Sequence, residues 1–316
     1  MYKTSNSPVF YDQFKSLKRD ILKRLRISYQ QYISSLIFDD SNCLHDNNKK
    51  FWTYIKNLRK DNHSIPPLSL GDTVISESSH KSEVFNNYFK SVFTVENLQN
   101  FPEKGSSPHP DIDDITISSS GILKLLNGLN VNKATGPDHI GARVLKETSS
   151  AIAPILRIIF QCSLDTGIIP EDWKAANIVP IHKKSDRSNP ANYRLISLTC
   201  ITCKLFEHII ASHIMQHLEI NSILYDLQHG FRQNRSCETQ LLSFIHELMF
   251  NHDKDIQSDI ILMDFAKAFD KVPHKHLLYK LHWYGVQGSI HHWIQSFLSN
   301  RTQRVIIDGT VPHQCL

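Results

Sequence analysis

The sequence predicts an α/β protein, in which helices and short strands follow one another along a chain of 316 residues. Two observations lead to this class. Apolar residues recur with a helical period in several segments, most regularly between residues 201 and 220. Apolar runs that are too short for a helix occur at Ile178–Ile181 and Ile260–Met263, as in strands. A chain of this length can bury a large core, as one large domain or as two.

The composition is that of an ordinary soluble protein, with 41% apolar and 21% charged residues. Lys and Arg number 35 against 31 Asp and Glu, so the formal charge of +4 is no argument for nucleic-acid binding. The N-terminus lacks the apolar core of a signal peptide, and no run is long enough to span a bilayer. We therefore expect an intracellular protein, cytoplasmic or nuclear, without a membrane partner. Six scattered cysteines are consistent with reduced thiols.

Residues 1–98 predict a basic, helical N-terminal extension. Between residues 14 and 26, Lys and Arg are interspersed with apolar residues, which is typical of an amphipathic helix with a cationic face. A second cluster at residues 49–56 interleaves lysines with aromatic residues and can bind a nucleic-acid backbone while stacking bases. A solvated helix face with core aromatics explains the same cluster, and the pattern alone favours that alternative. Residues 99–114, rich in Pro, Ser and Asp, predict a flexible linker before the main domain, residues 115–316.

The main domain opens with helical segments. Residues 122–126 have a helical pattern, and Asn132–Ile140 contains Gly-Pro-Asp, which is common turn chemistry. A further helix follows. The apolar residues expected on its buried face are Ile152, Ile155, Leu156 and Ile159.

Two strands are predicted next. Ile178–Ile181 forms the first, and Pro180 indicates that this strand lies at a sheet edge. A polar turn leads to the second strand at residues 192–198. Two strands joined in this way can present Lys183 and Arg194 on one surface.

Cys200 and Cys203 have the spacing of half a zinc site or of a redox pair. No second cysteine pair follows them, and the residues after Cys203 have a helical period. We therefore expect core cysteines on a helix.

Two later segments have clear local signals. Residues 228–241 predict a loop that enters a helix, with Ser236 as the N-cap. Residues 301–307 are β-rich and are followed by Asp308 and Gly309, a strong hairpin-turn signal.

The apolar run Ile260–Met263 has no polar alternation, which suits a strand buried on both faces. It ends on Asp264, and helix-compatible residues continue until Pro273 breaks the run. Such a strand holds a metal ligand rigidly, because packing fixes the backbone while the side chain meets solvent. An acid at a strand end also serves as a helix cap, so the pattern alone leaves both roles open.

The whole phrase Asp259–His274 resembles the first metal-binding motif of reverse transcriptases, in particular those of non-LTR, LINE-type retrotransposons such as jockey. Residues 132–140, 192–198 and 228–241 resemble further motifs of this family, and the resemblance extends over nearly the whole chain. It implies the fingers and the first part of the palm of a right-hand polymerase, preceded by a helical extension.

The resemblance also implies roles for individual residues. Asp264 would be the catalytic ligand of Mg²⁺ or Mn²⁺. Lys183 and Arg194 would bind the triphosphate of the incoming dNTP. Phe265 would lie at the nucleotide, and Phe269 under its sugar, where it rejects a 2′-hydroxyl. The residues expected to contact the RNA template or the DNA primer are Lys133, Arg232, Arg301 and Arg304. Charges such as Arg301 and Arg304 serve equally well to protect a strand edge from aggregation.

The chain departs from the family pattern in three respects. Ser185 stands where the family has Gly and Leu195 where it has Pro, changes that loosen or reshape the fingers hairpin. The Tyr- or Phe-Ala-Asp-Asp motif that completes the metal site does not occur, so we expect a fragment of an RNA-directed DNA polymerase that is inactive alone. The alternatives are a remnant that binds nucleic acid without chemistry and a product that does not fold stably.

Overall fold

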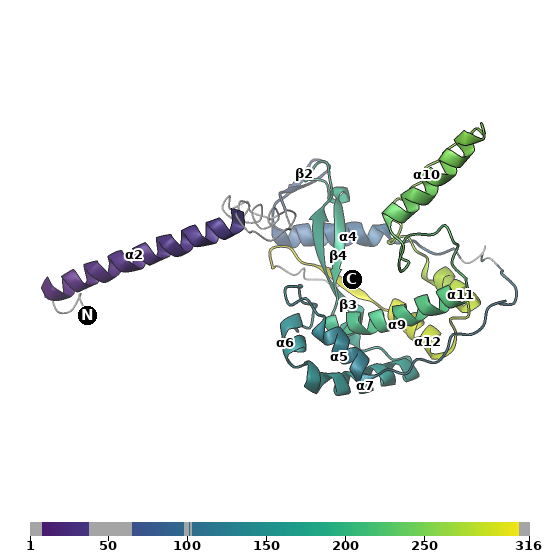
Figure 1. Ribbon diagram of the computed structural model, residues 1–316, viewed down its shortest axis with the longest axis horizontal. Coiled ribbons are helices and arrows are strands. Elements are labelled where there is room, and N and C mark those ends of the chain that lie inside the picture. The colour runs from purple at the N-terminus through teal and green to yellow at the C-terminus, as the bar shows by residue number, and fades with distance from the viewer. Residues whose placement is uncertain (1–7, 38–64, 98–100, 102, 310–316) are drawn as a thin grey trace. The chain divides into compact units, whose positions relative to one another are not determined.

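The computed structural model describes residues 8–37, 65–97, 101 and 103–309, and the chain divides into two compact units, Met1–Ser64 and Ile65–Leu316. The first unit contains α2 (Pro8–Ile37), a helix of 30 residues (Figure 1). All side chains described between residues 12 and 32 are exposed. The helix predicted for the N-terminal extension is therefore confirmed. The basic and aromatic cluster at residues 49–56 lies outside the described residues.

The second unit contains a three-stranded sheet in the order β4-β3-β5. β3 (Ala175–His182) pairs with β4 (Tyr193–Leu198) in antiparallel fashion, as predicted, and with β5 (Thr302–Val305) in parallel fashion. The edge position predicted from Pro180 is wrong, because β3 is the middle strand. β5 pairs only with Ala175–Ile178, so Pro180 lies beyond the stretch in which both neighbours contact β3.

Helix α4 (Ser78–Val92) covers one face of this sheet. Phe85 packs edge-on against Tyr193 of β4, with ring centroids 4.9 Å apart. The buried members of this core are Leu68, Phe85, Phe89, Ala176, Ile178, Tyr193, Val305 and Ile307. A short hairpin of β1 (Leu68–Leu70) and β2 (Thr73–Ile75) joins the same core. The compact unit thus begins at Ile65, well before the boundary that composition predicts at residue 115.

A second and larger core lies among the helices. The helices that contribute to it are α5 (Ser119–Asn127), α6 (Ala142–Glu147), α7 (Ser149–Thr166), α8 (Glu171–Lys174), α9 (Ile201–Ile220) and α12 (Gly288–Leu298), with α11 (His274–Trp283) packed at its side. At its centre Phe160 stacks on Phe206 with ring centroids 4.6 Å apart, and Trp293 meets Phe206 edge-on. These aromatic contacts fix α7, α9 and α12 relative to one another.

The buried face of α7 differs from the predicted one. Leu156 is buried as expected, but Ile155 and Ile159 are exposed. The face that packs contains Ala153, Leu156, Phe160 and Leu164. The helical period was correct, but an excess of apolar residues on this helix left the choice of face open, and the stacked Phe160–Phe206 pair decided it.

The segment predicted to be a flexible linker is docked on the helical core. The Nζ atom of Lys104 lies 4.1 Å from the ring centroid of Trp283. Ser107 Oγ donates a hydrogen bond to the Trp283 carbonyl at 2.6 Å, and the amide of Ile112 donates to the Gly285 carbonyl at 2.8 Å. Pro and Ser indicate a chain without regular structure, but they do not prevent such specific contacts.

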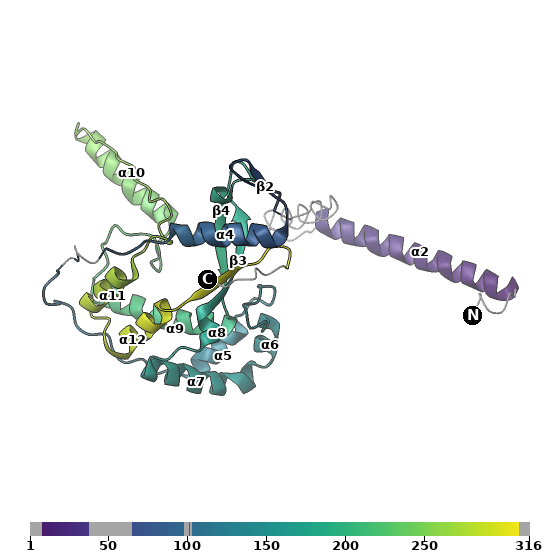
Figure 2. The ribbon, with the colours of Figure 1, turned by 180° about the vertical axis from the view of Figure 1, so that it is seen from behind.

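Helix α10 (Cys237–Asp253) and the residues after it contrast with both cores. Figures 1 and 2 both show α10 extending away from the helices and sheet of its unit, and none of its residues is buried. Residues 256–265 have no regular structure, and Leu262 is 90% exposed. The buried strand predicted at Ile260–Met263 is therefore wrong. A strand needs a neighbour, and the strands of the described sheet pair only with one another.

Within the described ranges, no helix combines the length and the apolar character needed to cross a bilayer.

Candidate functional site

Two cations lie on the exposed face of the β3–β4 hairpin. Arg194 is paired directly with Ile181, and the amide of Lys183 donates to the Asn192 carbonyl at 2.8 Å, which continues the strand pairing. Because side chains alternate along a strand, Lys183 lies on the same face as Ile181 and therefore as Arg194. Both cations are exposed. The prediction that this hairpin presents them on one surface is confirmed.

The turn of this hairpin contains a strained residue. Ser185 has φ +68°, in the left-handed region that favours glycine, and its carbonyl lies 3.0 Å from Nε2 of His182. Ser188 donates hydrogen bonds to both carboxylate oxygens of Asp186, and these bonds hold the pKa of Asp186 below its usual value. The turn thus keeps its shape through side-chain bonds, although Ser185 stands where the resembled family has Gly.

Asp264 lies in the irregular segment after α10, and its side chain is exposed. Phe265 and Phe269 follow it with side chains 81% and 78% exposed. None of the residues that the structure describes buries the side chain of Asp264, so its carboxylate is open to solvent and to a ligand. Protein-bound Mg²⁺ keeps several waters and is held by one or two carboxylates together with substrate phosphates. The exposed Asp264 can supply one such carboxylate. Among the described residues, no group of three or more His, Cys, Asp or Glu side chains could hold a metal.

The loop that follows Asp264 is held by residues from α4 and the segment after it. Lys267 Nζ donates to the hydroxyl of Tyr88 at 2.6 Å and lies 4.5 Å from the centre of its ring. Thr94 Oγ1 donates to the Lys271 carbonyl at 2.9 Å. We call these contacts, with the one described next, the brace of the Asp264 loop.

The third contact of the brace caps a helix. The amide of Lys275, in the first turn of α11, donates to Oε1 of Glu96 at 2.7 Å. A carboxylate at this position accepts from an amide that has no partner within the helix. Its negative charge is also stabilised by the positive end of the helix dipole. The brace thus links residues 88–96 to residues 267–275 at three points.

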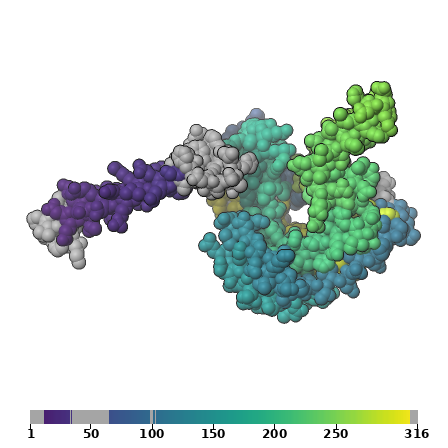
Figure 3. Space-filling view, viewed as in Figure 1, coloured from purple at the N-terminus to yellow at the C-terminus, as the bar shows by residue number. Residues whose placement is uncertain are grey.

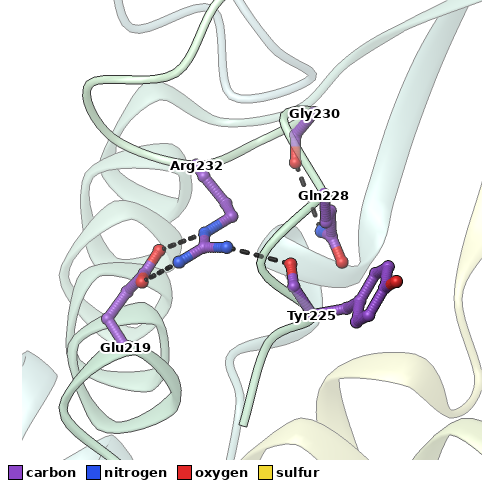
Figure 4. Close-up of polar contacts among 5 residues, drawn as sticks. All are labelled: Glu219, Tyr225, Gln228, Gly230 and Arg232. Atoms are coloured by element: carbon purple, nitrogen blue, oxygen red, sulfur yellow. Dashed lines mark hydrogen bonds and ion pairs between the residues drawn. The ribbon is translucent and has the colours of Figure 1, made fainter. Parts of the chain in front are cut away.

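The predicted cation Arg232 has an internal role. Figure 4 shows its guanidinium between Glu219 of α9 and the carbonyl of Tyr225. Arg232 Nε and Nη2 donate to the two carboxylate oxygens of Glu219 at 2.8 and 2.5 Å, and Nη1 donates to the Tyr225 carbonyl at 3.0 Å. The paired carboxylate raises the pKa of Arg232, and Arg232 lowers the pKa of Glu219. These bonds use most of the donors of Arg232 to hold its own loop.

The same loop is fixed at its other end. The imidazole Nδ1 of buried His229 lies 2.8 Å from Oγ1 of Thr239. Ser236 caps α10 as predicted, because its Oγ accepts from the Thr239 amide while Thr239 Oγ1 accepts from the Ser236 amide. We call residues 225–239 the knot loop, since Arg232, His229 and Ser236 each tie it to a helix.

The knot loop brings one aromatic ring to the Asp264 loop. Phe231 has φ +61° and is 85% exposed. Its ring meets that of Phe269 edge-on, with centroids 6.0 Å apart. In the space-filling view an opening separates the β3–β4 hairpin from the green segment after α9, to which the knot loop belongs (Figure 3).

The other residues predicted to contact nucleic acid fall into two groups. Lys133 is exposed. Arg304 Nε donates to Oδ1 of Asn177 at 2.7 Å, and Arg301 donates to the Phe297 carbonyl at 3.2 Å while stacking on the Phe297 ring. The structure thus leaves Lys133, Lys183 and Arg194 exposed, and engages Arg301 and Arg304 in internal contacts, as it does Arg232.

The cysteine pair belongs to the helical core, as predicted. Cys200 and Cys203 are both buried at the start of α9. Burial raises the pKa of Cys200 to about 11 and raises that of Cys203 further, so both thiols stay protonated at neutral pH.

The Gly-Pro-Asp turn packs more closely against the start of α9 than its sequence indicates. A Cβ atom at Gly136 would lie 2.5 Å from the Cys200 amide nitrogen and from the carbonyl carbon of Thr199. Gly136 is thus required by this contact. The sequence does not indicate the brace either, because its members are far apart in sequence and have no shared motif.

Comparison with known proteins agrees with these features. Residues 181–314 match the family described as reverse transcriptase (RNA-dependent DNA polymerase). The chain is 27% identical over 245 residues to the RNA-directed DNA polymerase from mobile element jockey of Drosophila melanogaster, which covers 73% of this chain and 26% of that protein. It is 25% identical over 299 residues to the probable RNA-directed DNA polymerase from transposon BS of Drosophila melanogaster. This stretch covers 90% of this chain and 32% of that protein.

A third relative has a higher identity over a shorter stretch. It is the probable RNA-directed DNA polymerase from transposon X-element of Drosophila melanogaster, 32% identical over 152 residues, or 48% of this chain and 17% of that protein. The chain therefore spans no more than 32% of the length of these three relatives. The motifs, the paired cations of the hairpin and these likenesses point the same way. Residues 181–314 thus match the reverse transcriptase family, and the chain is similar to RNA-directed DNA polymerases of jockey-like, non-LTR retrotransposons.

Proposed function

We propose that this chain supplies the fingers and part of the palm of an RNA-directed DNA polymerase, which extends a DNA primer on an RNA template from dNTPs. The observation that carries the proposal is the shared exposed face of Lys183 and Arg194, in a domain that also presents Asp264 to solvent. Two exposed cations side by side suit a triphosphate, whose negative charge must be neutralised as pyrophosphate leaves.

In the proposed nucleotidyl transfer each of these residues has a separate role. The primer 3′-hydroxyl gives up its proton to water as its oxygen forms a bond to the α-phosphorus, and the bond from that phosphorus to the pyrophosphate oxygen breaks. Lys183 and Arg194 bind the β- and γ-phosphates and stabilise the charge on the leaving group. Phe269 orients the sugar, and Asp264 would hold Mg²⁺ or Mn²⁺, which supplies Lewis-acid stabilisation of the transferred phosphoryl group when bound.

A binding measurement on the purified chain tests the role of the two cations. Lys183→Ala and Arg194→Ala should each weaken the binding of Mg²⁺-dNTP by about 10-fold or more, because each removes a charge-assisted contact. Lys124→Ala is the matched control, since Lys124 is an exposed lysine of α5. Equal affinity of the three variants and the unchanged chain would refute the proposed triphosphate site.

We further propose that the 316 residues alone do not catalyse primer extension. Two-metal chemistry uses more than one carboxylate, and Asp264 is the one acid to which the family resemblance gives a metal-binding role. The purified chain should bind a DNA primer on an RNA template, with affinity that falls steeply as salt rises, but should leave the primer unextended. Extension that is lost in Asp264→Asn would show instead that the chain is a complete catalyst.

Binding without chemistry is therefore the second candidate function. It is favoured by the exposed cations Lys133, Lys183 and Arg194 together with the basic helix α2, whose side chains between residues 12 and 32 are exposed.

A further inference from the structure

Phe231 is an aromatic ring held out into solvent by a loop that is fixed on both sides. Arg232, next to it, is tied to Glu219 and to the Tyr225 carbonyl, and His229, two residues before it, contacts Thr239. The backbone of Phe231 is in the left-handed region at φ +61°, which a bulky residue adopts only when its surroundings impose it. The position of the ring is thus set by the knot loop and not by packing.

The ring lies against the Asp264 loop. Phe231 and Phe269 meet edge-on with centroids 6.0 Å apart, yet they remain 85% and 78% exposed. Folding has brought together two rings from segments 38 residues apart in sequence without covering either. An exposed aromatic pair of this kind leaves ring faces in water that a further flat ring can cover.

The knot loop also supplies a positive charge, which suits a nucleic-acid strand. Arg235 is exposed on the same loop, four residues after Phe231, and the resembling motif places the metal ligand Asp264 five residues before Phe269. Aromatic rings beside a cation form the usual binding surface for single-stranded nucleic acid, in which rings stack on bases and cations follow the backbone. Stacking accepts every base, as a template strand requires, because each base has an aromatic face.

We propose that Phe231, whose ring meets Phe269 edge-on, forms a stacking platform for an unpaired base of the RNA template, next to the place where Phe269 orients the sugar of the incoming nucleotide. This inference rests on the proposed polymerase function and deepens it. The knot loop then contacts nucleic acid through Phe231 and Arg235, while Arg232 holds the loop in place. Phe231 is accordingly a template-positioning residue.

Binding of two matched probes tests the platform. Each probe is a labelled DNA primer annealed to RNA, and one carries a short unpaired template extension while the other is blunt. Phe231→Leu should weaken binding of the extended probe roughly 5- to 100-fold and leave the blunt probe unaffected. Phe231→Trp should restore the preference, because it returns an aromatic face. Leu keeps the apolar character and the backbone strain of position 231, so the comparison isolates the ring.

Tyr225→Leu is the matched control within the knot loop. Tyr225 is an exposed aromatic, and its contact with Arg232 is made by its backbone carbonyl, which the substitution keeps. This variant should bind both probes as the unchanged chain does. As a second readout, photo-crosslinking from 5-iodouracil at the first unpaired template position should map to Phe231. Thermal melts monitored by circular dichroism should be the same for all variants.

The outcomes separate this inference from the proposed function. If the chain binds both probes but Phe231→Leu keeps the full preference for the extended one, the platform is wrong and the polymerase assignment stands. If Phe231→Leu instead weakens binding of free Mg²⁺-dNTP and spares the extended probe, the ring serves the incoming nucleotide and the template assignment is overturned. If the unchanged chain binds neither probe, the proposed function fails and the platform fails with it.

Discussion

Two regions of this protein have equally apolar sequences and opposite environments. In the β3–β4 hairpin, strand pairing satisfies the backbone and α4 covers one face, so Ile178 and Tyr193 are buried. Between α10 and Phe269, Leu262, Met263 and Phe265 are all more than 80% exposed. The difference shows that apolar residues make a segment suitable for a buried strand, whereas its burial requires a partner surface elsewhere in the fold.

The largest expected effect comes from replacing one leucine in the core that packs against the β3–β4 hairpin and one in the exposed segment before Asp264. Leu68→Ala, in the fully buried core under the hairpin, should lower the free energy of unfolding by about 2–5 kcal/mol. Leu262→Ala should change it by less than about 0.5 kcal/mol, since this side chain is 90% exposed. Chemical denaturation of both variants measures the two values. A large loss for Leu262→Ala would show that the segment is packed in solution and would break the comparison.

A second test concerns the junction between the hairpin and the helical core. Gly136→Ala should destabilise the protein by about 2 kcal/mol, because its Cβ would lie 2.5 Å from backbone atoms of Thr199 and Cys200. Gly128→Ala is the control, since the nearest atoms there are 3.5 Å away and φ is −77°. Denaturation midpoints measure both. Equal stability of the two variants would mean that the turn can move away from α9.

The brace offers a test on the exposed side. Tyr88→Phe removes the hydroxyl that accepts from Lys267 and should speed hydrogen exchange in residues 264–272 by about fivefold, which corresponds to about 1 kcal/mol. Tyr225→Phe removes the hydroxyl of an exposed tyrosine and should leave exchange there unchanged. Unchanged exchange in Tyr88→Phe would show that Thr94 and Glu96 suffice to hold the loop.

The turn of the hairpin should gain stability from one substitution. Ser185→Gly relieves a left-handed backbone conformation and should raise the free energy of unfolding by about 0.5–1 kcal/mol. Ser197→Gly, within β4, should have the opposite sign, because glycine weakens a strand interior. A thermal melt distinguishes the two. A loss of stability in Ser185→Gly would indicate that the serine side chain contributes more than its backbone strain costs.

The smallest effect concerns the Arg232–Glu219 pair and its pH dependence. Arg232 holds the pKa of Glu219 below its usual value, so the pair stabilises the fold above the unfolded pKa and that contribution disappears as pH falls through the folded one. The unchanged chain should therefore melt above Glu219→Gln at pH 7, and the difference should shrink below about pH 4. The effect is small because water screens the pair. A constant difference at all pH values would contradict an ionic origin.

Local signals in the sequence predicted local structure well. The period of residues 201–220 predicted α9, Ser236 predicted the cap of α10, and the alternation across the polar turn placed Lys183 and Arg194 on one face. Asp308 and Gly309 both have positive φ, as a type I′ turn requires, and the residues after Gly309 lie outside the described part of the chain. Each of these features depends on neighbours within a few residues.

The errors and omissions concern distant neighbours. Pro180 indicated an edge strand because β5, more than 120 residues later, cannot be foreseen from Pro180. Ile260–Met263 has the composition of a buried strand but lacks a pairing partner in the described sheet. The family resemblance predicts that Arg232, Arg301 and Arg304 contact nucleic acid, and this stays a prediction. Their internal acceptors in Glu219, Phe297 and Asn177 were not foreseen, because they are set by tertiary structure. The charge of an arginine predicts that it will have a hydrogen-bond acceptor, but it does not identify that acceptor.

The brace has a consequence for how this domain can change over time. Tyr88 and Lys267 are 179 positions apart, and Thr94 and Glu96 reach equally far along the chain. Residues 181–314 include the whole recognisable motif but none of these three supporting side chains. Substitutions near residue 88 must therefore stay compatible with those near residue 267. If recombination between diverged copies of the gene exchanged only one of these two segments, the Asp264 loop would lose the contacts of the brace.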